Sequence, residues 1–129
     1  MGGSAALRLA ELGVDTILLE AETVGAGASS RPGGFVVPHF SVGSPLDVLD
    51  RVGPQGETLI EMVGGSADHL FSKIGKYGLD CDGAQDGWYH PAHSPKALAR
   101  LKGLADQWAD FGVKLIRLDA QQAEHATGV

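Results

Sequence analysis

The sequence has a single cysteine, few basic residues and no long apolar run. Because Cys81 has no second cysteine to pair with, an internal disulfide framework is excluded. No stretch reaches the roughly 18 consecutive apolar residues of a membrane-spanning helix. No basic segment precedes an apolar one near the N-terminus, so no signal peptide is visible. We therefore expect a cytoplasmic protein that does not act on membranes.

Basic residues are outnumbered, with 10 Lys and Arg against 16 Asp and Glu and a net charge of −6. This balance argues against a nucleic-acid backbone or an anionic membrane as the main partner. At 129 residues and 43% hydrophobic content, the chain is long and apolar enough to form one small domain with a core. We expect a small-molecule partner, and the chain could also form a homo-oligomer.

Glycine is abundant, with 19 residues in 129. That is about twice the usual share of roughly 7%. The glycines cluster at 2–3, 25–27, 33–34 and 64–65, which lie at expected junctions between elements. Such clusters indicate tight backbone turns, some of them close to a ligand.

Helical and strand-like patterns alternate along the chain, which favours an α/β fold with a parallel sheet. The stretch 41–54 has no clear pattern. The predicted helices are 5–12, closed by Gly13; 57–74, weakened or kinked at Gly64-Gly65; 95–111, opened by Ser94 and Pro95 and ended by Gly112; and a helical start at 120–125. The predicted strands are 14–19, two short ones within 79–90, and 113–118.

The opening of the chain looks like a dinucleotide-binding βαβ unit whose first strand is missing. Gly2 would be the last glycine of a GxGxxG turn, where a helix N-terminus holds the pyrophosphate. Glu20 follows 18 residues later, at the end of the predicted strand. A carboxylate about 20 residues after the glycines accepts hydrogen bonds from the adenosine ribose in such units.

Residues 20–34, EAETVGAGASSRPGG, sharpen this interpretation. They resemble the segment LEA…GxGASGRNGG of FAD-dependent oxidoreductases in the D-amino-acid oxidase superfamily. The γ-glutamylputrescine oxidoreductase-like and glycine/sarcosine oxidase-like group is the most similar. Shorter stretches at 78–81, 87–89 and 111–113 support the resemblance, which covers nearly the whole chain.

The resemblance implies a partial Rossmann-like FAD-binding domain over residues 1–129. It implies that the parent enzyme oxidises the C–N bond of an amine or amino acid by hydride transfer to flavin. Family members are several times longer, so we expect a fragment that is inactive alone and binds FAD weakly. Pro32 stands where the family has Asn, which removes a backbone donor. The implied cofactor-binding residues are Gly2, Glu20, Ala21, Ser29, Ser30, Arg31, Gly33 and Gly34, and no catalytic residue is implied.

Other interpretations stay open at this point. The parent could be an NAD(P)H-linked flavoprotein, or the chain could be a non-catalytic truncated remnant that folds only with a partner. Glu20 could be a surface carboxylate, residues 21–34 a flexible connector and Arg31 a solvated charge. A metal site is not expected, because the stretch 90–93, HPAH, with Cys81 lacks a matched fourth ligand.

Overall fold

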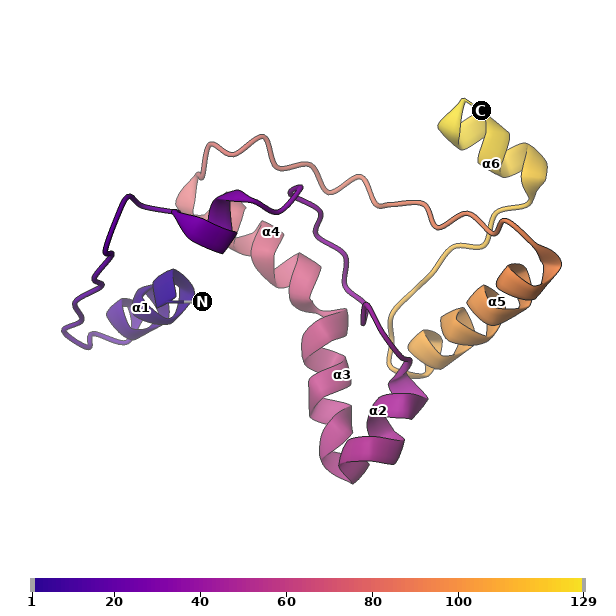
Figure 1. Ribbon diagram of the computed structural model, residues 1–129, viewed down its shortest axis with the longest axis horizontal. Helices are drawn as coiled ribbons and strands as arrows, with labels where there is room; N and C mark the ends of the chain where they lie inside the picture. The colour runs from indigo at the N-terminus through magenta and orange to yellow at the C-terminus, as the bar shows by residue number, and fades with distance from the viewer. Residues whose placement is uncertain (1, 129) are drawn as a thin grey trace. The chain divides into compact units, whose positions relative to one another are not determined.

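The computed structural model describes residues 2–128 as helices joined by extended or irregular segments (Figure 1). The chain divides into two units, Met1–Phe35 and Val36–Val129, with residues 1 and 129 themselves outside the described part. The α-helices are α1 (Gly2–Glu11), α2 (Pro45–Val52), α3 (Gly56–Gly64), α4 (Ser66–Tyr77), α5 (Pro95–Asp110) and α6 (Ala120–Thr127). The short 3-10 helices are η1 (Gly27–Ser30) and η2 (Gly53–Gln55).

The first unit consists of α1, an extended segment and η1. Helix α1 ends where the chain turns back, with the Val14 N–H donating to the Leu9 carbonyl at 3.0 Å. Residues 14–20 then run extended to Glu20. No described residue of this unit is buried. The unit therefore has no apolar core of its own.

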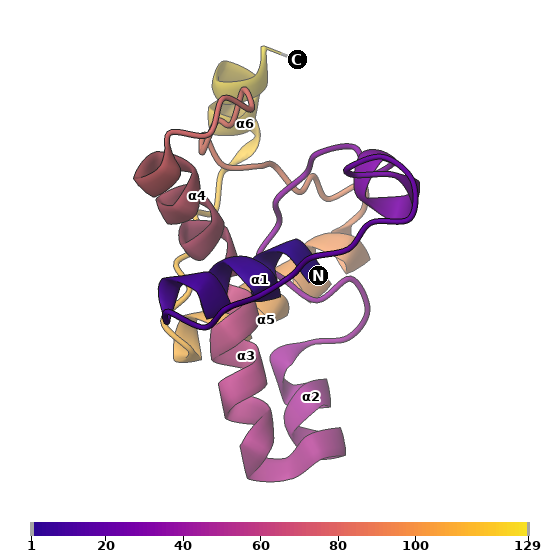
Figure 2. The same cartoon turned by 90° about the vertical axis from the view of Figure 1, so that its left-hand side faces the viewer.

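The second unit begins its helical part with a tight pair, α2 and α3, joined by η2 (Figure 2). Ser44 caps α2: its hydroxyl accepts from the Asp47 N–H, and the Asp47 carboxylate accepts from the Ser44 N–H at 2.7 Å. This reciprocal capping box satisfies two donors that a helix N-terminus leaves free. Close approach of the pair is possible because Gly56 has no β-carbon, which would lie 3.2 Å from Val48 Cγ1.

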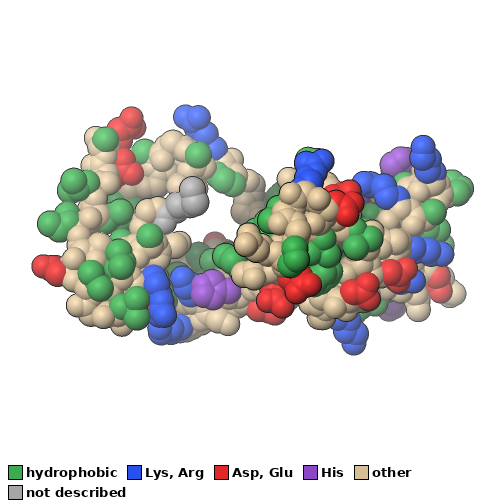
Figure 3. All heavy atoms as spheres, turned by 90° about the horizontal axis from the view of Figure 1, so that it is seen from below, with side chains coloured by type: hydrophobic (Ala, Val, Ile, Leu, Met, Phe, Trp, Pro, Cys, Tyr) green, Lys and Arg blue, Asp and Glu red, His purple; other side chains and the backbone are tan. Residues whose placement is uncertain are grey.

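The small core of the second unit lies where α3 and α5 meet the chain around them. Ile60 on α3 is fully buried, and Trp108 on α5 is 2% exposed. The Phe40 ring stacks on Trp108 with ring centroids 5.5 Å apart. A hydrogen bond of 3.3 Å from the Leu46 N–H to Gln107 Oε1 ties α2 to α5. Many other apolar side chains stand at the surface (Figure 3).

The predicted parallel sheet is wrong, because residues 2–128 contain no strand. Residues 14–20, 82–92 and 113–119 do run without helical structure, but no backbone ladder joins them. An apolar run indicates that a segment is fit for burial, whereas a strand also requires a second backbone to pair with. Ile17 and Leu19 accordingly remain 83% and 86% exposed. The predicted Rossmann-like arrangement is wrong for the same reason, because it requires a parallel sheet.

The helix predictions agree with the structure better than the strand predictions do. Helix α2, Pro45–Val52, lies in the stretch 41–54, where the sequence showed no clear pattern. The helix expected over 57–74, weakened or kinked at Gly64-Gly65, is instead two helices, since α3 ends at Gly64 and α4 begins at Ser66. Ser94 caps α5 as predicted, with its hydroxyl accepting from the Ala97 N–H at 3.2 Å. Among the described residues, no helix combines the length and apolar content needed to cross a membrane.

Candidate functional site

The candidate cofactor segment is the exposed, small-residue stretch from Glu20 to Gly34. All eight residues predicted to bind the cofactor belong to the first unit. From Gly27 to Phe35 every residue is exposed. Short side chains leave the backbone N–H groups of this stretch open to a ligand, which is the arrangement that suits phosphate oxygens.

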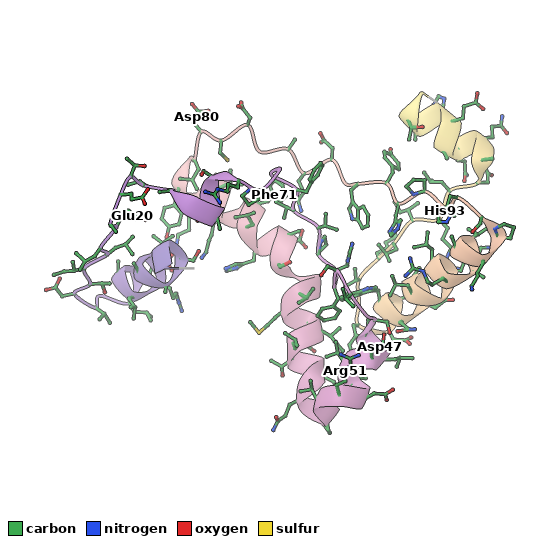
Figure 4. The ribbon with its side chains drawn as sticks, in the orientation of Figure 1. Glu20, Asp47, Arg51, Phe71, Asp80 and His93 are labelled. Carbon is green, nitrogen blue, oxygen red and sulfur yellow. The ribbon has the colours of Figure 1, made fainter. Side chains whose placement is uncertain are left out.

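Glu20 ends the extended segment 14–20, and its side chain stands in the open (Figure 4). Its Oε1 atom accepts the Ala21 N–H at 2.8 Å and the Glu22 N–H at 3.2 Å. These two bonds hold the carboxylate at the start of the turn. The Oε2 atom has no hydrogen-bond partner among the described residues, so it can accept from a hydroxyl of a ligand. The Ala21 backbone N–H is thus engaged with the Glu20 carboxylate.

Ser29 and Ser30 lie on η1, and Arg31 caps its C-terminal end. The Ser30 hydroxyl donates to the Gly27 carbonyl at 3.3 Å, and the Arg31 N–H donates to the Ala28 carbonyl at 3.3 Å. Within residues 2–128, Arg31 forms no ion pair and the Ser29 hydroxyl no hydrogen bond. A guanidinium without an acidic partner is available to a phosphate or carboxylate.

Three glycines of this segment adopt a backbone conformation that side chains rarely allow, and the first of them is Gly25, with φ of +83°. Gly27, at the start of η1, and Gly34 both have φ of +77°. A β-carbon in this left-handed region is strained whatever space surrounds it. Gly34 was predicted as a cofactor residue, whereas Gly27 was missed, although its place between small residues was the available signal. Gly33 has no such φ, but a β-carbon there would lie 3.2 Å from the Phe35 ring.

Gly2 lies at the first turn of α1, beside the extended segment. A β-carbon on Gly2 would be 3.4 Å from Leu18 Cδ1, so the helix start and the segment leading to Glu20 approach each other. No hydrogen bond or ion pair among the described residues joins Glu20 to Ser29, Ser30 or Arg31. The structure thus places Gly2 by the segment that leads to Glu20, whereas no hydrogen bond or ion pair of the described residues links Glu20 to η1.

The donor and acceptor set fits a dinucleotide in its chemistry. A free carboxylate oxygen suits ribose hydroxyls, and open N–H groups with a free guanidinium suit phosphates. Cys81 is exposed and carries no disulfide. Within the described residues, no three His, Cys, Asp or Glu side chains lie close enough to hold a metal ion together.

Comparisons with known proteins add an independent result. A family model described as "DAO: FAD dependent oxidoreductase" matches residues 1–128. Gamma-glutamylputrescine oxidoreductase of Escherichia coli (strain K12) is 34% identical over 121 residues, or 91% of this chain and 27% of that protein. Probable oxidoreductase OrdL of Haemophilus influenzae is 39% identical over 82 residues, or 63% of this chain and 19% of that protein. The chain thus spans about a quarter of the first relative's length and a fifth of the second's. No solved structure gave a significant match.

Proposed function

Because the chain belongs to the DAO family of FAD-dependent oxidoreductases, we propose that residues 20–34 bind FAD within an enzyme that oxidises amines or amino acids. The family membership expected from the sequence is confirmed by the match over residues 1–128. The bond we propose to be oxidised is a C–N bond. The support for this substrate class is the name of the E. coli relative, an oxidoreductase of gamma-glutamylputrescine, which is an amine.

One observation carries the cofactor assignment: the stretch 27–35 exposes its backbone and the Arg31 guanidinium to a ligand, and it begins seven residues after Glu20, whose carboxylate has one oxygen without a partner among the described residues. In this proposal the Glu20 Oε2 atom accepts from a ribose hydroxyl. The N–H groups of η1 and the Arg31 side chain meet the pyrophosphate. Gly33 and Gly34 let the backbone pass close to the flavin, because no side chain stands between.

A bound FAD supplies a two-electron acceptor for the hydride that leaves the carbon next to the substrate nitrogen. The described residues contribute binding and orientation to that reaction. None of the eight is placed as a proton donor or acceptor for the substrate. We assign no catalytic residue to this chain.

A second function, from a different class, is supported by the bare apolar surface of the first unit. A non-catalytic chain that folds only against a partner would show this pattern, because Ile17 and Leu19 are 83% and 86% exposed. Monomeric soluble proteins seldom leave such contiguous apolar residues uncovered. A partner-dependent chain would gain helix content and protease resistance only when the partner is present, whereas a cofactor-binding chain would respond to FAD.

The test of FAD binding uses the chain of residues 1–129 at increasing FAD, followed by flavin fluorescence and equilibrium dialysis. We expect weak, reversible and saturable binding, with the flavin lost on gel filtration, because ordering an exposed loop consumes part of the binding energy. Riboflavin, which has no pyrophosphate or adenosine, is the matched control and is expected to bind much less. Equal binding of riboflavin and FAD, or no binding at all, would refute the assignment.

The substrate class needs the protein purified from the cells that make it and reconstituted with FAD. Anaerobic mixing with amines, amino acids, NADH or NADPH is followed by the visible absorbance of oxidised flavin. We expect an amine or amino acid to bleach the flavin. Bleaching by NADH or NADPH alone would instead favour the NAD(P)H-linked alternative.

A further inference from the structure

The chain changes abruptly from exposed to half-buried directly after the proposed cofactor segment. Residues 27–35 are all exposed, whereas residues 36–40 are all half-buried. The change falls at the boundary between the two units, Phe35 and Val36. Contacts within the second unit therefore cover residues 36–40.

Two consecutive residues of this stretch each contact a different tryptophan. His39 lies on Trp88, with ring centroids 5.0 Å apart and the ring planes at 38°. Phe40 stacks on Trp108, with centroids 5.5 Å apart and the planes at 26°. Trp108 belongs to α5 and is 2% exposed, so Phe40 is attached to the core of the second unit. Ring pairs at these separations attract each other beyond simple burial.

Backbone pairing does not explain the position of residues 36–40. The described part of the chain has no strand, and the one backbone hydrogen bond within this stretch runs from the His39 N–H to the Val37 carbonyl, at 2.9 Å. His39 Nδ1 lies 2.5 Å from the Phe40 carbonyl oxygen. Since a carbonyl only accepts, Nδ1 carries a proton and donates to it. This bond sets the orientation of the imidazole that meets Trp88.

Trp88 is held from its own side as well. Its ring centroid is 5.2 Å from that of His90, two residues further along the same extended segment. Trp88 is 40% exposed, so it is not a core residue like Trp108. The half-exposed Trp88 ring thus contacts the rings of both His39 and His90. The contact with His39 links two segments that are about 50 residues apart in the sequence.

We propose that His39 and Trp88 are positioning residues that fix residues 36–40, the stretch that follows the proposed FAD-binding segment 20–34. Gly34 lies five residues before His39, so a His39 held by Trp88 restricts the conformations open to the end of the segment. The inference rests on the proposed function for its consequence, which is tighter FAD binding. The anchoring of residues 36–40 by Trp88 is a separate claim that does not depend on FAD.

The anchoring is tested by amide hydrogen exchange on the whole chain without FAD. We expect Trp88→Ala to accelerate exchange of the His39 N–H, the hydrogen-bonded amide of this stretch, by roughly 2- to 12-fold, the factor that corresponds to one aromatic pair. Trp88→Phe, which keeps a ring, restores most of the protection. Tyr89→Ala is the matched control, because Tyr89 is exposed and has no ring contact among the described residues. Unchanged exchange of the His39 N–H in Trp88→Ala would overturn the anchor.

Two further measurements keep the test decisive. If Trp88→Ala also loses protection in α5, the gentler variant His39→Ala replaces it, and a double-mutant cycle of the two residues reports their coupling. FAD affinity is then compared between wild type, Trp88→Ala, Trp88→Phe and Tyr89→Ala. A loss of affinity in Trp88→Ala alone supports the positioning role. Faster exchange with unchanged FAD affinity refutes it, whereas a wild-type chain that binds no FAD refutes the proposed function and leaves the anchor judged by exchange.

Discussion

Val113 packs against Gly64 so closely that a β-carbon on residue 64 would lie 2.7 Å from the Val113 Cγ2 atom. The same β-carbon would stand 3.4 Å from Cζ3 of Trp108. Gly64 is the last residue of α3, so this contact sets the distance between the end of α3 and the chain that follows α5. The missing side chain is therefore part of how the small core closes.

We predict that Gly64→Ala lowers the free energy of unfolding by about 1–3 kcal/mol, the usual cost of overpacking. The matched control is Gly103→Ala on α5, where a β-carbon would meet no atom within 4 Å. That change should raise stability by about 0.5–1 kcal/mol, since alanine favours a helix over glycine. Urea titration followed by circular dichroism measures both. Equal effects of the two substitutions would show that the Gly64 contact is not tight.

A second prediction concerns the core residue Ile60, which is fully buried on α3. Ile60→Ala should destabilise the chain by about 2–5 kcal/mol, because it removes buried methyl groups and leaves a cavity. Met62→Ala on the same helix is the control, since Met62 is 68% exposed and should change stability by less than about 0.5 kcal/mol. Tryptophan fluorescence in urea reports unfolding around Trp108. A stable Ile60→Ala variant would mean that Ile60 is not central to the core.

The capping box at the start of α2 yields a third prediction. Ser44→Ala removes the hydroxyl that accepts the Asp47 N–H at 3.3 Å. The expected cost is about 1 kcal/mol of stability, the typical value for losing an N-cap. Ser44→Asn keeps a side-chain acceptor and should retain most of the stability. The midpoint of urea unfolding compares the two, and a midpoint for Ser44→Ala equal to that of wild type would argue against the box.

The fourth prediction tests the carboxylate of the FAD segment. Glu20→Gln should weaken FAD binding by about 10- to 150-fold, if one charge-assisted hydrogen bond worth about 1.5–3 kcal/mol is lost. Glu22→Gln is the control, because it removes the same charge two residues away from the predicted contact. Fluorescence titration with FAD gives both dissociation constants. Equal weakening in the two variants would point to general charge rather than to a bond from Glu20.

Local signals in the sequence predicted several helices, but not α2, which lies in the stretch 41–54 that had no clear pattern. Ser94 before Pro95 marked the start of α5, and Gly65 marked the break between α3 and α4, because caps and glycine act through neighbouring backbone groups. The segment 20–34 likewise indicated the family, which the comparison with known proteins confirmed. That each of the eight predicted residues, Arg31 among them, contacts the cofactor remains a prediction.

Tertiary structure decided what local patterns could not. The apolar run 14–19 was compatible with a buried strand, yet no second segment of the described chain pairs with it, because pairing depends on what lies beside a segment rather than on its own residues. The contact of Gly64 with Val113 and that of His39 with Trp88 each join residues about 50 positions apart in the sequence. The sequence by itself determined the start of α5 and the family, since these depend on neighbours along the chain. Only the tertiary structure decided which rings meet and that no sheet forms within residues 2–128, since both depend on distant segments coming together.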